Sequence, residues 1–187
     1  MGTLKTTNIQ TITGSGTLTL GTSGETLALG SGVTSNLMYP AFMATMGTSN
    51  QNVTDATPTK VQLTNEVLDT DNAFDNSTNY RFTVPSGGAG KYLINGAVTL
   101  RANATSISTV YAYLYKNGSG VNLSMANFNG SLVMITTQDF SVDIDLVAGD
   151  YLELFGYVDG SGTTAFDPGV SNDTIKSTYL AGYRIGT

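Results

Sequence analysis

The segment Tyr92-Leu-Ile94-Asn-Gly-Ala-Val98-Thr-Leu100 decides the fold class of this chain. Apolar side chains recur at every second position, with a glycine in the middle, and this is the period of a β-strand that buries one face. The same alternation appears in Phe140-Ser-Val142-Asp-Ile144-Asp-Leu146 and, over fewer residues, in Tyr80-Arg-Phe82-Thr-Val84. No segment from Pro40 onward keeps a helical period, so we predict an all-β sandwich.

Three dipeptides in this region are typical of tight turns: Asn117-Gly118, Asn129-Gly130 and Asp159-Gly160. Asparagine, aspartate and glycine tolerate the positive backbone φ angles that two-residue hairpin turns require, so we expect the chain to reverse at each. The spacing of strands and turns fits an immunoglobulin-like sandwich and a jelly roll equally well.

The composition excludes most catalytic machinery. The 187 residues include no histidine and no cysteine, so nucleophile–imidazole pairs, thiolate metal sites and disulfides are excluded. The net charge of −6 argues against nucleic acid and anionic membranes as partners. No segment has the roughly 18 apolar residues of a membrane span, and the start lacks the apolar stretch of a secretory signal. We therefore expect a non-enzymatic protein that is made in the cytoplasm.

Residues 1–36 contain a nine-residue repeat. Thr17-Leu-Thr-Leu-Gly21 recurs as Thr26-Leu-Ala-Leu-Gly30, and each copy places two leucines on one face of an extended strand. A single ribbon has too little apolar surface to offset the entropy of ordering it. We predict a stem arm in which the leucines of sister chains pack together, and the alternative is a flexible linker. The predicted packing residues are Leu18, Leu20, Leu27 and Leu29.

A series of motifs between residues 37 and 187 resembles, in its order, the globular head of complement-one-q, a member of the tumour-necrosis-factor-like superfamily. The motifs are Pro40-Ala-Phe42, Lys60-Val-Gln-Leu63, Asn72-Ala-Phe74-Asp75, Tyr80-Arg-Phe82-Thr-Val-Pro85, Gly90-Lys-Tyr92-Leu-Ile94, Val110-Tyr-Ala-Tyr-Leu114-Tyr-Lys-Asn-Gly118, Gly149-Asp150-Tyr-Leu152-Glu-Leu154 and Ser177-Thr-Tyr179-Leu-Ala-Gly182-Tyr183-Arg-Ile185. The resemblance implies a ten-strand jelly-roll head and a tight homotrimer. The chain departs from the family's Asp-x-x-Thr-Gly step, where it has Thr78-Asn79.

Two strands near the end are apolar on both faces, which favours the trimer. Leucines alternate with aromatic residues in Tyr151–Val158, and tyrosines line one side of Tyr179–Ile185. Two apolar faces need two covering surfaces, and the core of one domain supplies only one. The alternative is that tyrosine simply favours strands and tolerates water. The predicted trimer interface is formed by Tyr151, Phe155, Tyr157, Tyr179, Tyr183 and Ile185.

The opening segment Met1-Gly-Thr-Leu-Lys-Thr-Thr-Asn-Ile-Gln10, followed by Gly/Ser/Thr-rich repeats, resembles the openings of fibre proteins of marine tailed phages. This resemblance implies a virion structural protein. Its residues 1–36 would dock on other virion proteins, and its head would contact the host surface. The alternative within the same class is a fibre that decorates the capsid and has no receptor role.

One strand offers a candidate recognition surface. It places Tyr111, Tyr113 and Tyr115 on one face and aliphatic residues on the other, so the tyrosines face outward if the aliphatic side is core. Aromatic rings stack on the apolar faces of sugars, and their hydroxyls hydrogen-bond to the rim. We therefore predict that this ladder binds a host surface polysaccharide. The alternative is that the tyrosines are merely exposed or pack on a neighbour.

An acidic cluster comprises Glu66, Asp69, Asp71 and Asp75, together with Asn72, in one loop-like stretch. Calcium takes six to eight oxygen ligands, so Asp69, Asp71 and Asp75 are candidate calcium ligands. The spacing is not that of an EF-hand, because the glycine and glutamate of that loop are missing. The alternative is a solvated polar loop. No other cofactor is expected.

Asp143 and Asp145 occupy alternate positions of one strand and project from the face opposite its apolar residues. Paired carboxylates cleave glycosides across a cleft, so a glycan depolymerase is the enzymatic alternative. A solvated strand face that resists edge aggregation explains the same pair without any chemistry.

Overall fold

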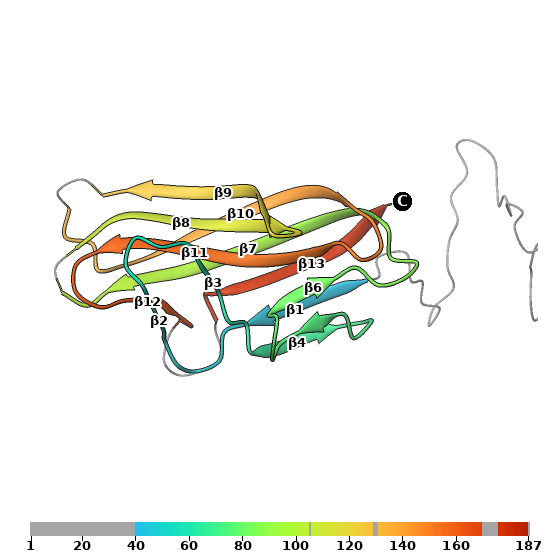
Figure 1. Ribbon diagram of the computed structural model, residues 1–187, viewed down its shortest axis with the longest axis horizontal. Coiled ribbons are helices and arrows are strands. Elements are labelled where there is room, and N and C mark those ends of the chain that lie inside the picture. The colour runs from blue at the N-terminus through green and yellow to red at the C-terminus, as the bar shows by residue number, and fades with distance from the viewer. Residues whose placement is uncertain (1–39, 105, 129–130, 170–175, 187) are drawn as a thin grey trace, which may run out of the picture. The chain divides into compact units, whose positions relative to one another are not determined.

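The computed structural model describes residues 40–104, 106–128, 131–169 and 176–186. These residues form two antiparallel sheets and no helix (Figure 1), so the predicted all-β sandwich is confirmed. In the described part of the chain no helix is long and apolar enough to cross a membrane. The predicted arm, with Leu18, Leu20, Leu27 and Leu29, falls outside the described residues.

The first sheet, sheet A, follows the order β2-β12-β7-β13-β1-β4. One edge of β7 pairs with β12 and β13, and its other edge pairs with β10. Its strands are β1 (Ala41–Thr45), β2 (Gln51–Val53), β4 (Asn65–Asp69), β7 (Gly90–Ala102), β10 (Ile135–Leu146), β12 (Thr164–Asp167) and β13 (Tyr179–Gly186). The second, sheet B, follows the order β5-β6-β11-β8-β9, with β3 also on β11. Its strands are β3 (Thr59–Lys60), β5 (Phe74–Asp75), β6 (Arg81–Thr83), β8 (Ile107–Lys116), β9 (Ser119–Asn127) and β11 (Tyr151–Gly160).

The connections make this sandwich a jelly roll. The chain changes sheet between β6 and β7, between β7 and β8, and again at each connection from β9 to β12. Such crossing separates a jelly roll from a sandwich of simple hairpins, and it confirms the predicted fold. The described residues hold thirteen strands rather than ten, because short segments such as β3 and β5, of two residues each, also pair.

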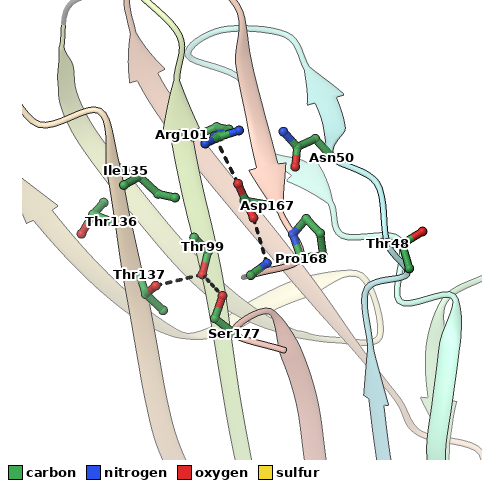
Figure 2. A pocket seen from close by; sticks show the side chains of 11 residues that line it. Thr48, Asn50, Thr99, Arg101, Ile135, Thr136, Thr137, Asp167, Pro168 and Ser177 are labelled. Carbon is green, nitrogen blue, oxygen red and sulfur yellow. Dashed lines mark hydrogen bonds and ion pairs between the residues drawn. The ribbon is translucent and has the colours of Figure 1, made fainter. Parts of the chain in front are cut away.

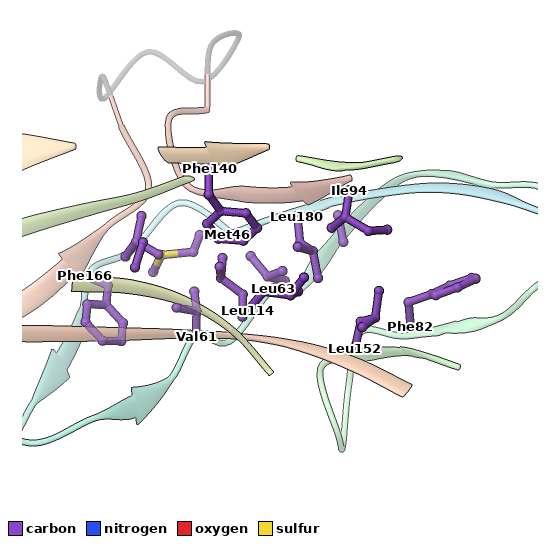
Figure 3. Packing of buried hydrophobic residues seen from close by; sticks show 14 of the residues in the cluster. Met46, Val61, Leu63, Phe82, Ile94, Leu114, Phe140, Leu152, Phe166 and Leu180 are labelled. Carbon is purple, nitrogen blue, oxygen red and sulfur yellow. The ribbon is translucent and has the colours of Figure 1, made fainter. Parts of the chain in front are cut away.

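Apolar side chains from both sheets fill the space between them (Figure 3). Ile94 of β7 and Leu180 of β13 extend from sheet A, and Leu114 of β8 and Leu152 of β11 extend from sheet B; all four are fully buried. The alternating residues that predicted the strands are therefore the residues of the core.

A glycine lets one aromatic ring reach the middle of the core. A Cβ atom at Gly156, in β11, would lie 2.6 Å from the ring of Phe166 and 3.2 Å from Val98. Phe166 is fully buried. Because interiors are close-packed, this ring of sheet A can lie against sheet B only where the facing strand has no side chain.

Asp150 joins two turns at one end of the sandwich. Its carboxylate accepts hydrogen bonds from Asn117 Nδ2 at 2.7 Å and from the backbone N–H of Val147 at 2.9 Å. Lys116 Nζ lies 2.8 Å from the same carboxylate, and Asn117 Oδ1 accepts the N–H of Tyr151 at 2.9 Å. The predicted Asn117-Gly118 turn is confirmed, with φ angles of 53° and 79°, and it is bonded to the turn that leads into β11.

The predicted turn at Asp159-Gly160 is wrong. Both residues belong to β11, where they pair with Thr109 and Ile107 across a β-bulge. The chain reverses after Gly160, with Gly162 at a φ of 81°. A bulge and a turn both favour glycine, so the dipeptide alone could not separate them. The third predicted turn, Asn129-Gly130, lies outside the described residues.

We predict that Asp150→Asn lowers the free energy of unfolding by about 1.5–3 kcal/mol, because the charge-assisted bonds of a buried carboxylate are lost. These bonds lower the pKa of Asp150 from 3.8 to about 2, and the bond from Lys116 has the largest effect. Since the folded-state pKa is depressed, the contribution is complete above about pH 4 and is lost as the pH falls through about 2.

Urea unfolding at equal protein concentration measures this effect. Asp143→Asn, at an exposed position of β10, is the control and should change stability by less than about 0.5 kcal/mol. The stability difference between wild type and Asp150→Asn should shrink from pH 5 towards pH 2. A difference that does not change with pH would contradict the role of the charge.

Candidate binding surfaces

Five aromatic side chains form one surface on the face of sheet B that is turned away from the core. We call it the aromatic surface; its members are Tyr111, Tyr113 and Tyr115 of β8 and Phe155 and Tyr157 of β11. It forms because β8 and β11 pair with Phe155 opposite Tyr113 and Tyr157 opposite Tyr111. Directly opposite residues point to the same side of a sheet. The intervening residues of β8 are fully buried, so the predicted tyrosine ladder does face outward.

The rings of the aromatic surface pack against one another. Tyr115 and Phe155 are stacked with centroids 4.2 Å apart, and Tyr111 meets Tyr157 edge to face at 4.9 Å. Tyr113 lies between its two ladder neighbours at 5.4 Å and 5.9 Å. Both arrangements are favourable for aromatic pairs. The rings are therefore held in place, and part of their area is already covered by other rings.

Tyr115 has one open side, because β9 carries a glycine beside it. A Cβ atom at Gly120 would lie 3.5 Å from the Tyr115 ring, at ordinary contact distance. Phe155 covers the ring from the β11 side, whereas Gly120 leaves the β9 side free. A pocket of about 430 Å³ opens at this place, and its walls are formed by Tyr113, Tyr115, Gly120, Val121, Asn122 and Leu123.

The electrostatics differ along the aromatic surface. Partial burial raises the pKa of Tyr113 and of Tyr157, and the nearby Asp159 raises that of Tyr157 further. Beside Phe155, the nearly buried carboxylate of Glu153 pairs with Lys60 and leaves no net charge. The middle of the surface is thus neutral and apolar, and its Tyr157 end is negative.

A second apolar surface lies on the outer face of sheet A. Met43 of β1 pairs with Leu68 of β4, whose side chain is 48% exposed. Tyr179 and Tyr183 of β13 point outward beside β1, since Leu180 between them is buried. Ile185 follows and is 40% exposed.

The residues predicted for the trimer interface fall on two opposite faces. Phe155 and Tyr157 belong to the aromatic surface on sheet B, and Tyr179, Tyr183 and Ile185 belong to sheet A. Tyr151 also lies on the outer face of sheet B, where the Arg81 guanidinium sits 4.2 Å from its ring centroid. The sequence showed that each strand has two apolar faces. It could not show that the outward faces of β11 and β13 are turned away from each other, because that depends on sheet assignment.

A polar cleft of about 590 Å³ lies on the outer side of sheet A (Figure 2). Thr99 and Arg101 of β7 form its floor, and Thr137 of β10 and Asp167 of β12 stand on its two sides. Arg101 Nε lies 3.1 Å from Asp167 Oδ2. Nothing in the sequence pattern pointed to this cleft, because its polar residues come from distant segments.

The three candidate calcium ligands do not converge in the structure. Glu66 and Asp69 belong to β4 rather than to a loop. Asp69 accepts the N–H groups of Asp71 and Phe74, and Asp75 accepts those of the residues that follow it. These bonds lower the pKa of Asp75. Among the described residues no group of three or more acidic side chains is placed to hold a metal ion.

Asp143 and Asp145 project outward from β10, as predicted, and both are exposed. Asp145 pairs with Lys91 at 2.8 Å, which raises the pKa of that lysine. Neither carboxylate lines the polar cleft of sheet A. The arrangement matches a solvated strand face more closely than a pair of carboxylates across a cleft.

Comparison with solved structures places the fold. The chain is similar to murine APRIL, with a TM-score of 0.54, 11% identity, and coverage of 78% of this chain and 98% of that one. It is similar to Eiger TNF from S. frugiperda, with a TM-score of 0.55, 10% identity and coverage of 78% and 92%. The globular domain of zebrafish complement 1qA gives a TM-score of 0.50, 14% identity and coverage of 78% and 97%.

No protein-family model and no curated protein sequence matches the chain. The head is therefore a jelly roll of the type seen in tumour necrosis factors and complement-one-q. At identities of 10–14% the similarity shows the fold alone.

Proposed function

We propose that this chain is a non-enzymatic, homotrimeric attachment fibre of a virion, and that its head binds a surface polysaccharide of the host through the aromatic surface. The observation that carries the proposal is the open side of Tyr115 above Gly120. Recognition there needs shape and apolar contact but no acid, base or nucleophile.

The glycan class follows from the chemistry of the pocket. Tyr115 presents an aromatic ring beside a space that a sugar ring can occupy. The apolar side of a pyranose stacks on such rings, while tyrosine hydroxyls bond to its hydroxyl groups. The negative end at Tyr157 and Asp159 repels acidic polymers. A neutral polysaccharide is the ligand that fits best.

The trimer is supported by the part of the outer face of sheet A that β1, β4 and β13 form. Met43, Leu68, Tyr179 and Tyr183 leave that face apolar in the single chain, and a large exposed apolar face is typical of an interface. The resemblance to the complement-one-q family implies three copies. Repetition around a threefold axis would also turn three weak glycan sites into tight attachment.

The virion assignment rests on the opening residues and on the repeat in residues 1–36. They resemble phage fibre openings, and they precede the head in the chain. A fibre anchored by residues 1–36 would present its head, and with it the aromatic surface, to the host.

The glycan site can be tested at a single position. Gly120→Ala adds a methyl group at ordinary contact distance and should preserve binding. Gly120→Leu fills the pocket and should weaken binding by at least about tenfold. Titration of the full-length protein over an array of neutral and acidic bacterial surface polysaccharides measures both. Failure of the wild-type protein to bind any polysaccharide, or equal binding by Gly120→Leu, would refute the site and leave the capsid-decorating role.

The trimer is tested by light scattering on the full chain, which should give three times the 19.5 kDa of one chain. Leu68→Glu places a charge on the outer face of sheet A and should shift the protein to monomers. Leu123→Glu, at a leucine of β9 that is 52% exposed, is the matched control and should stay trimeric. A monomeric wild-type protein would exclude the trimer.

The anchoring role of the arm predicts that deletion of residues 2–36 leaves a folded head but abolishes incorporation into particles. Circular dichroism reports the fold of the truncated protein, and immunoblotting of purified particles reports its incorporation. Truncated heads at normal occupancy on particles would exclude anchoring by this segment.

A further inference from the structure

The polar cleft of sheet A exists because two strands share one edge of β7. The pairing of β13 with β7 begins at Tyr179, opposite Ala97, and the pairing of β12 ends at Asp167, opposite Thr99. Between these two points the described residues of the two arms are joined by the bridge between Gly169 and Lys176, by the N–H of Ser177, which donates to Pro168 O at 3.1 Å, and by the hydroxyl of Thr178, which donates to Asp167 O at 2.6 Å. The interruption leaves a cleft beside the floor of β7, on the face opposite to the aromatic surface.

A row of hydroxyl groups crosses the floor of the cleft. Thr99 Oγ1 lies 2.8 Å from Thr137 Oγ1 and 2.6 Å from Ser177 Oγ (Figure 2). Each hydroxyl has one donor and two acceptor positions. The two bonds of the row use two of the three donors, so the row still offers both a donor and acceptor positions to a ligand.

An ion pair lies beside this row, further along β7 (Figure 2). Asp167 is 6% exposed, its Oδ2 faces Arg101 Nε, and its Oδ1 accepts the N–H of Gly169 at 2.8 Å. The carboxylate is fixed by two partners, so its orientation and that of the guanidinium are set before any ligand arrives. The pair carries no net charge.

The remaining walls combine amide, hydroxyl and apolar groups. Asn50 and Thr48 approach from the loop after β1, and Ile135 and Pro168 supply apolar surface (Figure 2). Convergent polar groups thus make up most of the lining, and a volume of about 590 Å³ is within the usual range of small-molecule sites.

We propose that this cleft binds a neutral saccharide of one or two units. Such a ligand presents hydroxyls that both donate and accept, which matches the hydroxyl row, the amide and the ion pair. A simple anion would meet the carboxylate of Asp167 beside Arg101, and a simple cation would have to compete with Arg101 for Asp167. The neutral ion pair favours neither. This site is distinct from the aromatic surface and does not depend on the glycan binding proposed there.

The test uses the full-length protein with isotope-labelled isoleucine and leucine methyl groups. The Ile135 methyls report on the cleft, and the Leu123 methyls report on the pocket beside Tyr115. The probes are glucose, galactose, mannose, N-acetylglucosamine and their disaccharides, with glucuronate and glucosamine as charged counterparts. We expect at least one neutral sugar to shift Ile135 with a Kd on the order of 1 mM.

A bulky side chain at the cleft wall provides the variant. Thr137 is exposed on the edge strand β10, so Thr137→Trp should fold, fill the cleft and weaken the Ile135 response at least tenfold. Ser141→Trp adds the same side chain on the same face of β10, away from the cleft, and should bind like wild type. Gly120→Leu should also leave the Ile135 response unchanged.

Three results would overturn the proposal. The first is that no neutral sugar shifts the Ile135 methyl signals. The second is that Thr137→Trp binds like wild type. The third is that a charged counterpart binds more than tenfold tighter than its neutral sugar. Because Ile135 and Leu123 lie at different sites, failure of the cleft and failure of the aromatic surface give different spectra.

Discussion

The pairing of β7 is the constraint on which the rest of this structure depends. β7 is bonded to β10 from Gly90 to Arg101, and its opposite edge is shared by β13 and β12. Because side chains alternate along a strand, this one arrangement fixes two surfaces. Its inward residues, Ile94 among them, join the core, and its outward residue Thr99 becomes the floor of the polar cleft. A slip of one residue would exchange the two sets.

Aromatic packing on the outside of sheet B follows from the same geometry. Tyr113 stands opposite Phe155 and Tyr111 opposite Tyr157 across the β8–β11 pair, and Tyr115 stacks diagonally on Phe155, so the surface stabilises itself by ring contacts. Such packing uses area that would otherwise be available to a ligand. What remains open is decided by the neighbouring strand, where Gly120 lacks a side chain. The candidate site is therefore defined as much by a missing side chain as by the tyrosines.

The features that could be predicted from sequence are those that depend on local period. The alternation around Ile94 and the Asn117-Gly118 pair each determine local structure through neighbouring residues alone. The strands, the core and one hairpin could therefore be predicted. Which strands are neighbours is non-local information. For this reason the sequence could not show that Phe155 stacks on Tyr115, and its place in a trimer interface stays a prediction. The outward-facing ladder could be predicted, but the cleft beside Thr99 could not, because it gathers residues from five separated segments.

Because the Asn117 side chain bonds to Asp150, chemical change of the Asn117 amide would destabilise this end of the fold. Deamidation of Asn117 would replace the donor that now lies 2.7 Å from Asp150 with a second carboxylate. Two carboxylates at that separation cannot both be ionised without strong repulsion. The hairpin between β8 and β9 would then be pushed away from the start of β11. Slow ageing of the purified protein would accordingly begin at this end of the sandwich.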